Sequence, residues 1–288
     1  MQFPQIFVTG ATGRIGRMLQ HFWAASAIGE GVRWQARRPQ ADRSLDWAVF
    51  DPLDGNAGRA LAEAARGRDV ILCLGGVTPE RAAQADGCMT DNTALAKAAV
   101  RAGAETGARV LLTSSAAIYG SRTGLLSETM APTPVSDYGR AKADMEEACV
   151  KLADRLGVRV TSLRIGNVAG ADAILGNWRP GFALDRFPDG RTPRRSYIGP
   201  QTLARVLSDL CATPDLPAIL NVAAPGVVEM GALLDAAGLD WTARPATGRA
   251  IAEVRLSVAM LERVTGFATA DSQPEVMVAQ RNRLTPGT

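Results

Sequence analysis

The stretch FVTGATGRIG (residues 7–16) joins a short run of β-branched and aromatic residues to the start of a predicted helix. It spaces Gly10, Gly13 and Gly16 three residues apart, in the pattern T-G-x-x-G-x-x-G. Glycine lets the backbone turn tightly and approach a pyrophosphate, which the N–H groups and positive end of the following helix would stabilise. Glycines also gather in ordinary turns, but their place between a strand and a helix favours a dinucleotide site.

Short β-branched runs alternate with alanine-rich stretches through the first two-thirds of the chain. This alternation is typical of an α/β fold with a doubly wound parallel sheet and helices on both faces. Such sheets bind ligands in the loops at the carboxyl ends of their strands. Strands are predicted at residues 5–8, 32–36, 47–50, 70–74, 109–113, 159–165 and 218–223, and helices at 14–27, 56–66, 91–105, 138–156 and 202–212.

After Gly166 the alternation gives way to a stretch rich in glycine, proline, arginine and tryptophan. We therefore predict a dinucleotide-binding domain at residues 1–168, completed by 200–224. Residues 169–199 and 225–288 are expected to form a small substrate-binding lobe. No internal repeat or low-complexity tract interrupts the chain.

Composition excludes several classes of protein. The chain has 288 residues, 47% of them hydrophobic, and its net charge of +3 comes from arginines scattered among acids. This pattern indicates a soluble globular protein without a nucleic-acid footprint. Four cysteines without a C-x-x-C pair, and the single histidine His21, predict neither a metal site nor a disulfide framework.

Compartment and partners follow from the same features. The cysteines are expected to be buried thiols in a reducing compartment, and no apolar run approaches the length of a membrane span, so we predict a cytoplasmic protein. The expected partners are a small-molecule substrate and a second copy of the chain in a homodimer, with no nucleic acid and no membrane.

The end of the second predicted strand indicates which dinucleotide is bound. NAD-binding units usually place an acid there to hold the ribose 2′-hydroxyl, but this chain has Gln35 and Ala36, followed by Arg37 and Arg38. Arginine suits a 2′-phosphate, so we predict NADP, with NAD as the alternative, although exposed arginines after a strand are common. Asp51, after the third strand, could contact the adenine or cap the next helix.

Tyr138 and Lys142 stand one helical turn apart in SDYGRAKADMEEA (residues 136–148), which reads as a helix start. Only three of the 32 basic residues in the chain are lysines, so a lysine at this place suggests chemistry beyond plain charge. An ammonium group beside a phenol favours the phenolate and lowers the tyrosine pKa from about 10 toward neutrality. The pair therefore predicts an acid–base group.

Three motifs, in this order, resemble the extended short-chain dehydrogenase/reductase family of NAD(P)-dependent sugar epimerases, dehydratases and reductases. They are the glycine-rich loop, LLTSSAAIYG (residues 111–120) and Y-x-x-x-K (138–142). Looser matches follow in LRIGNVAG (163–170) and RRSYI (194–198). The resemblance, which extends to about residue 225, implies a Rossmann-type fold and an enzyme that uses a nicotinamide cofactor.

The resemblance also assigns roles to individual residues. It implies that Tyr138 is the general acid/base and that Lys142 tunes it and holds the nicotinamide ribose. Ser115, or alternatively Ser114, would hydrogen-bond the reacting carbonyl or hydroxyl. Asn92 matches an asparagine that organises a proton relay, although an asparagine at a helix start is just as often a cap. The predicted cofactor contacts are Gly10, Thr12, Gly13, Arg14, Ile15, Gly16, Arg37, Arg38, Asp51, Leu74, Gly75, Gly76 and Lys142.

Substrate contacts are expected at Ser115, at Asn167 and in the lobe. Trp178, Arg179 and Arg195 are the lobe candidates, and they are expected to face the nicotinamide across from the catalytic tyrosine. Packing or surface roles are the alternative for Asn167 and Arg195. The segment from 170 to 195 is shorter than in the nucleotide-sugar enzymes, which argues against a UDP- or dTDP-sugar.

Three functions are compatible with these motifs. The leading hypothesis is an NAD(P)-dependent oxidoreductase that moves a hydride between the nicotinamide and a hydroxyl or carbonyl of a sugar-like or other small substrate. The second is a sugar or nucleotide-sugar epimerase or dehydratase, in which the hydride returns to the substrate. The third is a non-catalytic dinucleotide-binding sensor or assembly subunit, which is disfavoured because Tyr138 and Lys142 are both present.

Overall fold

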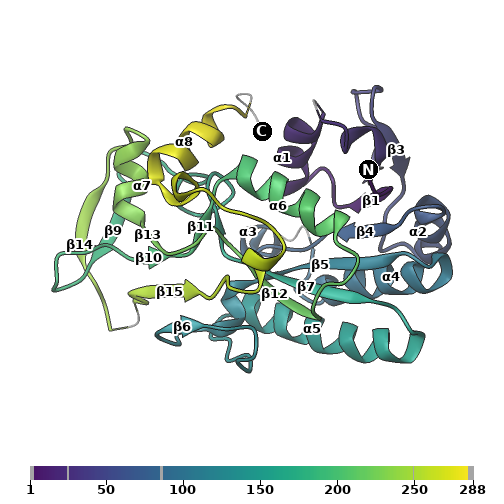
Figure 1. The fold of residues 1–288 in the computed structure, drawn as a ribbon. Coiled ribbons are helices and arrows are strands. Elements are labelled where there is room, and N and C mark those ends of the chain that lie inside the picture. Colours follow the sequence, from purple (N-terminus) through teal and green to yellow (C-terminus); the bar gives the residue numbers. More distant parts are fainter. Residues whose placement is uncertain (1–2, 25, 85–86, 249, 285–288) are drawn as a thin grey trace.

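A seven-stranded parallel sheet forms the centre of the computed structural model, which describes residues 3–24, 26–84, 87–248 and 250–284 (Figure 1). The predicted doubly wound parallel sheet is confirmed, because each strand pairs in parallel with its neighbours. In spatial order the strands are β3 (Asp46–Val49), β2 (Val32–Ala36), β1 (Ile6–Thr9), β4 (Val70–Cys73), β5 (Arg109–Ser115), β7 (Val160–Ile165) and β12 (Ile219–Val222).

Helices cover both faces of this sheet. The helices α1 (Arg14–Trp23) and α6 (Pro200–Ala212) pack together on one face, and α2 (Ala57–Ala65), α4 (Asp91–Thr106) and α5 (Asp137–Leu156) pack side by side on the other (Figure 1). Strand side chains alternate between the two layers, so all four residues of β1 are buried. This double burial explains why the strands read as continuous apolar runs.

The strand order reverses between β1 and β4, and the chain passes very closely there. Gly10 has a φ of +70°, and a Cβ on it would lie 2.5 Å from the backbone nitrogen of Gly75. A Cβ on Gly16 would lie 2.2 Å from the carbonyl oxygen of Ala11. Only glycine fits either position, and the reversal is where such sheets open a ligand crevice.

A second group of elements lies at the carboxyl edge of the sheet, on the left of Figure 1. A four-stranded sheet there has the order β13-β10-β15-β6, and the pairs β8 with β11 and β9 with β14 are separate. Buried side chains that include Leu184, Tyr197, Leu233 and Met277 form its core. The elements are β6 (Leu125–Leu126), β8 (Asn167–Val168), β9 (Ala183–Arg186), β10 (Arg194–Arg195), β11 (Tyr197–Ile198), β13 (Val228–Glu229), α7 (Met230–Ala236), β14 (Thr242–Pro245), β15 (Glu253–Leu256) and α8 (Pro274–Asn282). The short helix α3 (Pro79–Ala83), which follows β4 in the chain, lies nearer the centre of Figure 1.

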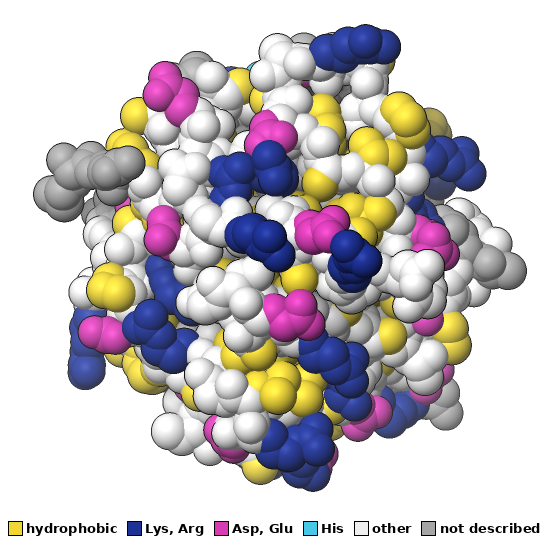
Figure 2. Space-filling view, turned by 90° about the vertical axis from the view of Figure 1, so that its right-hand side faces the viewer, with side chains coloured by type: hydrophobic (Ala, Val, Ile, Leu, Met, Phe, Trp, Pro, Cys, Tyr) yellow, Lys and Arg dark blue, Asp and Glu magenta, His cyan; other side chains and the backbone are white. Residues whose placement is uncertain are grey.

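The surface mixes charges of both signs. Figure 2, which views the side carrying β3 and α2 in Figure 1, shows Lys and Arg interspersed with Asp and Glu and with small apolar groups. Among the described residues, no helix is long and apolar enough to cross a membrane. Cys73, Cys149 and Cys211 are buried as predicted, but Cys88 is exposed, because it precedes α4 on a surface loop.

Candidate functional site

Two hollows at the carboxyl ends of β1, β4 and β5 share the glycine-rich loop. The larger, which we call the cleft, has a volume of about 500 Å³ and extends from Gly10 and Gly13 past Tyr138 to Asp172. The smaller, the side pocket, has a volume of about 120 Å³ and lies between the same loop and Asp51. Every predicted cofactor contact except Arg38 lines one of the two.

A side chain of β2 holds the glycine-rich loop in place by a hydrogen bond. Gly10 donates its N–H to Oε1 of Gln35 at 3.0 Å, and Nε2 of Gln35 donates to the carbonyl oxygen of Phe50 at 2.8 Å. Gln35, one of the two residues at the place of the usual ribose-binding acid, is thus tied to the loop, and it is buried. Gly13 is exposed at the start of α1, where backbone N–H groups can meet an anion.

The two arginines after β2 differ in position. Arg37 lines the side pocket together with Thr12 and Asp51. Arg38 is exposed and is not part of that lining. Oδ1 of Asp51 accepts the N–H of Leu53 at 3.0 Å, so the carboxylate already stabilises its own turn while facing the side pocket. Of the two candidates for a 2′-phosphate, the geometry favours Arg37.

The start of α5 brings Tyr138 and Lys142 into the cleft. Ser136 caps this helix, because its hydroxyl accepts the N–H of Gly139 at 3.1 Å. The side chain of Lys142 is buried, and its Nζ donates to the carbonyl oxygen of Thr113 at 2.9 Å. Nζ also lies 5.9 Å from the centre of the Tyr138 ring. The amine therefore lies beside the phenol, at the end of β5.

The titration of this pair differs from the expectation. Burial lowers the pKa of Lys142 to about 8. Burial also raises the pKa of Tyr138; a hydrogen bond with Ser115 opposes this shift, and the Glu80 carboxylate adds to it. The tyrosine pKa is therefore raised, and the prediction that it is lowered toward neutrality is wrong, because desolvation of the phenolate dominates.

Ser115 and Ser114 end β5 in different surroundings. Oγ of Ser115 accepts the N–H of Ala117 at 3.2 Å, and the Ser115 side chain also hydrogen-bonds Tyr138. Oγ of Ser114 is buried at the cleft and, among the described residues, has no hydrogen-bond partner. Ser115 therefore remains the better candidate for the hydrogen bond to the reacting oxygen of the substrate. The Ser114 hydroxyl is still able to form a hydrogen bond with a ligand.

Asn92 is completely buried at the start of α4 and lines the cleft. Its Oδ1 accepts the N–H of Val77 at 3.2 Å, and its Nδ2 donates to the carbonyl oxygens of Val77 and Met89, both at 3.1 Å. A Cβ on Gly76 would lie 2.8 Å from this Oδ1 and 3.3 Å from Nζ of Lys142. The amide is thus fixed by the backbone, with its oxygen on the lysine side.

The predicted substrate contacts divide into two groups. Ser115 and Asn167 line the cleft, but Trp178, Arg179 and Arg195 are not among its lining residues. The Trp178 indole donates to the carbonyl oxygen of Asp240 at 2.9 Å, and Arg179 is exposed. The Arg195 guanidinium donates to the carbonyl oxygens of residues 194, 251 and 252. The geometry gives these three predictions no support, because their side chains are engaged or exposed elsewhere.

Sequence reasoning missed one wall of the cleft. The short helix α3 places Glu80 and Arg81 along it, and Gln84 follows as the C-cap residue. A start signal was present in Thr78-Pro79, a cap residue followed by proline. Asp172 also lines the cleft and accepts the Tyr197 hydroxyl at 2.7 Å. No sequence signal pairs those two residues.

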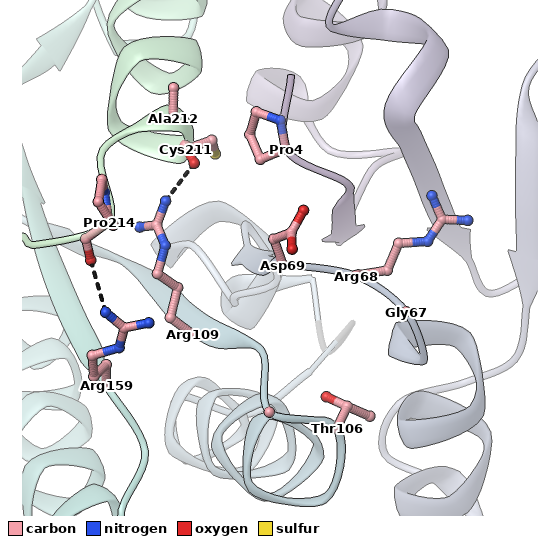
Figure 3. A pocket seen from close by; sticks show the side chains of 11 residues that line it. Pro4, Gly67, Arg68, Asp69, Thr106, Arg109, Arg159, Cys211, Ala212 and Pro214 are labelled. Atoms are coloured by element: carbon pink, nitrogen blue, oxygen red, sulfur yellow. Dashed lines mark hydrogen bonds between the residues drawn. The ribbon is translucent and has the colours of Figure 1, made fainter. Parts of the chain in front are cut away.

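A third hollow, of about 480 Å³, lies at the opposite edge of the sheet, where the strands begin (Figure 3). Two of its arginines point at backbone carbonyls: Arg109 donates to Cys211, and Arg159 donates to Pro214 (Figure 3). Arg109 also donates to Leu210. These side chains stabilise the end of α6 and the loop after it. We call this hollow the amino-edge hollow.

The described residues contain no group of His, Cys, Asp and Glu side chains arranged to hold a metal ion. The polar groups that converge on the cleft are a phenol, an amine, hydroxyls and amides. Together with a backbone anion site at the start of α1, this set suits proton transfer next to a bound dinucleotide.

Comparison with known proteins gives a consistent result. Residues 6–181 match the model of the NAD dependent epimerase/dehydratase family. A UDP-glucose 4-epimerase of Azospirillum brasilense is 31% identical over 181 residues, which are 59% of this chain and 50% of that protein. The chain thus spans about half the length of this curated relative.

Two solved structures share the fold over nearly the whole chain. A UDP-N-acetylglucosamine 4-epimerase from Methanobrevibacter ruminantium M1, in complex with UDP-N-acetylmuramic acid, is 18% identical, covers 98% of both chains and has a TM-score of 0.76. The dTDP-glucose 4,6-dehydratase DesIV from Streptomyces venezuelae, with NAD and TYD bound, is 20% identical, covers 96% of both chains and has a TM-score of 0.75. Because the family model covers more than half of the chain, including the glycine-rich loop and the Tyr-Lys pair, the protein belongs to the NAD-dependent epimerase/dehydratase family of extended short-chain dehydrogenases/reductases.

Proposed function

We propose that the protein is an NAD(P)-dependent oxidoreductase that transfers a hydride between the nicotinamide and a hydroxyl or carbonyl of a sugar-like or other small substrate. One observation carries the proposal: a single cleft joins the glycine-rich loop to Tyr138, Lys142 and Ser115. A non-catalytic sensor would have no need for an acid–base pair beside the cofactor loop.

The roles of the side chains follow from their positions. The dinucleotide, when bound, supplies or accepts the hydride. Tyr138 exchanges a proton with the substrate oxygen, and Ser115 hydrogen-bonds that oxygen. Because the pKa of Tyr138 is raised, the phenol is protonated at neutral pH, as proton donation to a carbonyl requires. Lys142 holds the ribose and stabilises the phenolate that forms.

Hydride transfer is tested by mixing the protein with NADPH and a panel of aldehydes, ketones and sugar lactones while following the absorbance of reduced nicotinamide. The proposal predicts oxidation of NADPH with at least one carbonyl, and none with Tyr138→Phe. Tight NADPH binding without turnover on any substrate, in either direction, would favour the non-catalytic alternative.

We further propose that NADP is the preferred cofactor. The family relatives support a nicotinamide dinucleotide, since the similar dehydratase structure holds NAD. The finer choice rests on Arg37, which lines the side pocket, and on the absence of a carboxylate at the end of β2. A planar, bidentate guanidinium is the donor that a 2′-phosphate favours.

Arg37 and Arg38 provide a matched pair for testing this choice. Wild type should bind NADPH roughly ten- to hundredfold more tightly than NADH, because charge-assisted hydrogen bonds contribute about 1.5–3 kcal/mol. Arg37→Ala should lose the preference, and Arg38→Ala should keep it. Equal affinities in wild type, or an unchanged preference in Arg37→Ala, would exclude the assignment.

A sugar epimerase or dehydratase is the second candidate, favoured by the family match and the curated relative. Such an enzyme would convert UDP-glucose or a free sugar without net change in the nicotinamide. Product analysis by NMR at constant NADH absorbance separates the two functions. Arg195, bonded to three carbonyls, offers no guanidinium to a nucleotide diphosphate in this geometry.

Three further assignments belong to the proposal. Residues 169–199 and 225–288 form the substrate-binding lobe, which the separate core around Tyr197 and Leu233 supports. The enzyme works in the cytoplasm, which its four unpaired cysteines support. It acts as a homodimer, which gel filtration with light scattering would test.

A further inference from the structure

Arg14 is placed unusually for a helix start. It is the first residue of α1, whose first turn contains no acidic residue and whose cap residue, Gly13, makes no side-chain hydrogen bond. A cation at the positive end of a helix is unfavourable. Sequences break such local rules mainly where function requires it, and this is the helix end at which a pyrophosphate would rest.

The Arg14 guanidinium spans the cleft to a distant part of the chain. Its Nη1 donates to the carbonyl oxygen of Ala171 at 3.2 Å, and its Nη2 donates to Oδ1 of Asn177 at 2.9 Å. Both acceptors are neutral, and the Glu80 carboxylate, whose pKa the charge of Arg14 helps to lower, is a counter-charge at the same cleft. An anion bound at the start of α1 would add a second counter-charge to Arg14 without displacing either hydrogen-bond partner.

Residues 171–177 form a braced turn that carries part of the cleft wall. Oδ1 of Asp172 accepts the N–H groups of Leu175 and Gly176 at 3.0 and 3.3 Å, and its Oδ2 accepts the Tyr197 hydroxyl. Ala171 and Asp172 line the cleft. A movement of this turn would therefore change the shape of the substrate end.

We infer that Arg14 is a positioning residue that couples cofactor binding to the 171–177 turn, so that a bound pyrophosphate fixes the guanidinium, and the guanidinium fixes the substrate wall. The inference rests on the proposed function. It predicts that cofactor and substrate bind cooperatively. The bound cofactor would already restrict the 171–177 turn, which substrate binding would otherwise have to restrict.

Hydrogen exchange of a peptide covering residues 169–178 tests the coupling without a known substrate. The probe is NADPH at saturation, and its affinity is measured on the same samples. In wild type, NADPH should slow exchange of this peptide by about fivefold or more. The NADPH affinity of Asn177→Ala should be within about twofold of wild type, because Arg14 is still present to bind the pyrophosphate. The variant should lose most of the slowing, because the hydrogen bond from Arg14 to the turn is removed.

Two further variants complete the design. Arg14→Ala should lose both the slowing and roughly tenfold in NADPH affinity. Arg17→Ala, which removes another exposed arginine one turn later on α1, is the matched control and should keep the slowing. Thermal melting confirms that all variants are folded.

The outcomes separate the inference from the proposed function. Binding of NADPH to wild type without slower exchange at 169–178, or unchanged slowing in Asn177→Ala, overturns the coupling alone. No binding of NADPH or NADH to folded wild type overturns the proposed function and the coupling with it.

Discussion

The cleft and the amino-edge hollow have similar volumes, about 500 and 480 Å³, and both are lined by arginines, yet they differ in how their polar groups are bonded. In the amino-edge hollow, Arg109 and Arg159 are bonded to backbone carbonyls. At the cleft, the Ser114 hydroxyl has no hydrogen-bond partner among the described residues, and Arg14 donates to two neutral acceptors. Size therefore does not distinguish the two hollows, whereas the bonding capacity of their lining residues does.

The largest effect on turnover is expected from removing the hydroxyl of Tyr138 at the cleft. Tyr138→Phe should reduce turnover by about 10²–10⁴-fold, because proton transfer to the substrate oxygen is lost, while NADPH affinity stays within about threefold. Steady-state kinetics and fluorescence titration measure the two effects.

Tyr119→Phe is the control for this substitution. The Tyr119 hydroxyl is buried and bonds Asn221 and Arg164 instead of lining the cleft. It should lower the stability by about 1–2 kcal/mol and leave turnover near normal. The reverse pattern in the two variants would contradict the assignment of the cleft.

At the amino edge, Arg109→Met should act on stability alone. The buried guanidinium donates to carbonyl oxygens at the end of α6, and leaving them unpaired should cost about 1–3 kcal/mol in the free energy of unfolding. Arg159→Met, at an exposed site, should cost less than about 1 kcal/mol. Urea denaturation measures both, and a loss of NADPH binding in either would show that the hollow has a functional role.

The pKa of Lys142 predicts a pH dependence at the cleft that the amino edge lacks. With a pKa of about 8, the amine is mostly charged at pH 7 and mostly neutral at pH 9. If the charged form binds the ribose, the dissociation constant of NADPH should rise about tenfold over this interval. Lys142→Met should bind weakly at both pH values, and an identical slope in that variant would exclude Lys142 as its source.

The smallest effect is expected from two buried hydroxyls that have no hydrogen-bond partner within the described part of the chain. Ser114 ends β5 at the cleft, and Ser162 lies in β7, outside the residues that line it. Replacing either by alanine should raise the free energy of unfolding by up to about 1 kcal/mol, because an unsatisfied group is removed. Calorimetry measures this gain. If Ser114→Ala lost more turnover than Ser115→Ala, Ser114 instead of Ser115 would be the residue that hydrogen-bonds the substrate oxygen.

Local patterns in the sequence predicted the parts of the molecule that local patterns determine. The strands of the main sheet and the helices α1, α2, α4, α5 and α6 appear within a few residues of their predicted bounds, because their apolar periodicity matches their burial. The glycine-rich loop could be located from its glycine spacing. Gly10 and Gly16 pack so closely against backbone atoms that no residue with a Cβ fits at either position.

Contacts between distant segments could not be predicted in this way. Arg195 looked like a substrate contact by motif, but its guanidinium turns toward the carbonyls of residues 251 and 252, which only the folded chain brings near. The bond between Arg14 and Asn177 spans 163 positions and has no local signature. Likewise, the tyrosine pKa depends on burial and on Glu80, from a helix that the sequence reading missed.

A crystal structure of the protein with NADP⁺ tests the central claim most directly. The account predicts the pyrophosphate on the N–H groups at the start of α1, the 2′-phosphate within hydrogen-bonding distance of Arg37, and the nicotinamide beside Tyr138 and Lys142. A dinucleotide bound in the amino-edge hollow, or one in the cleft with its nicotinamide turned away from Tyr138, would contradict it.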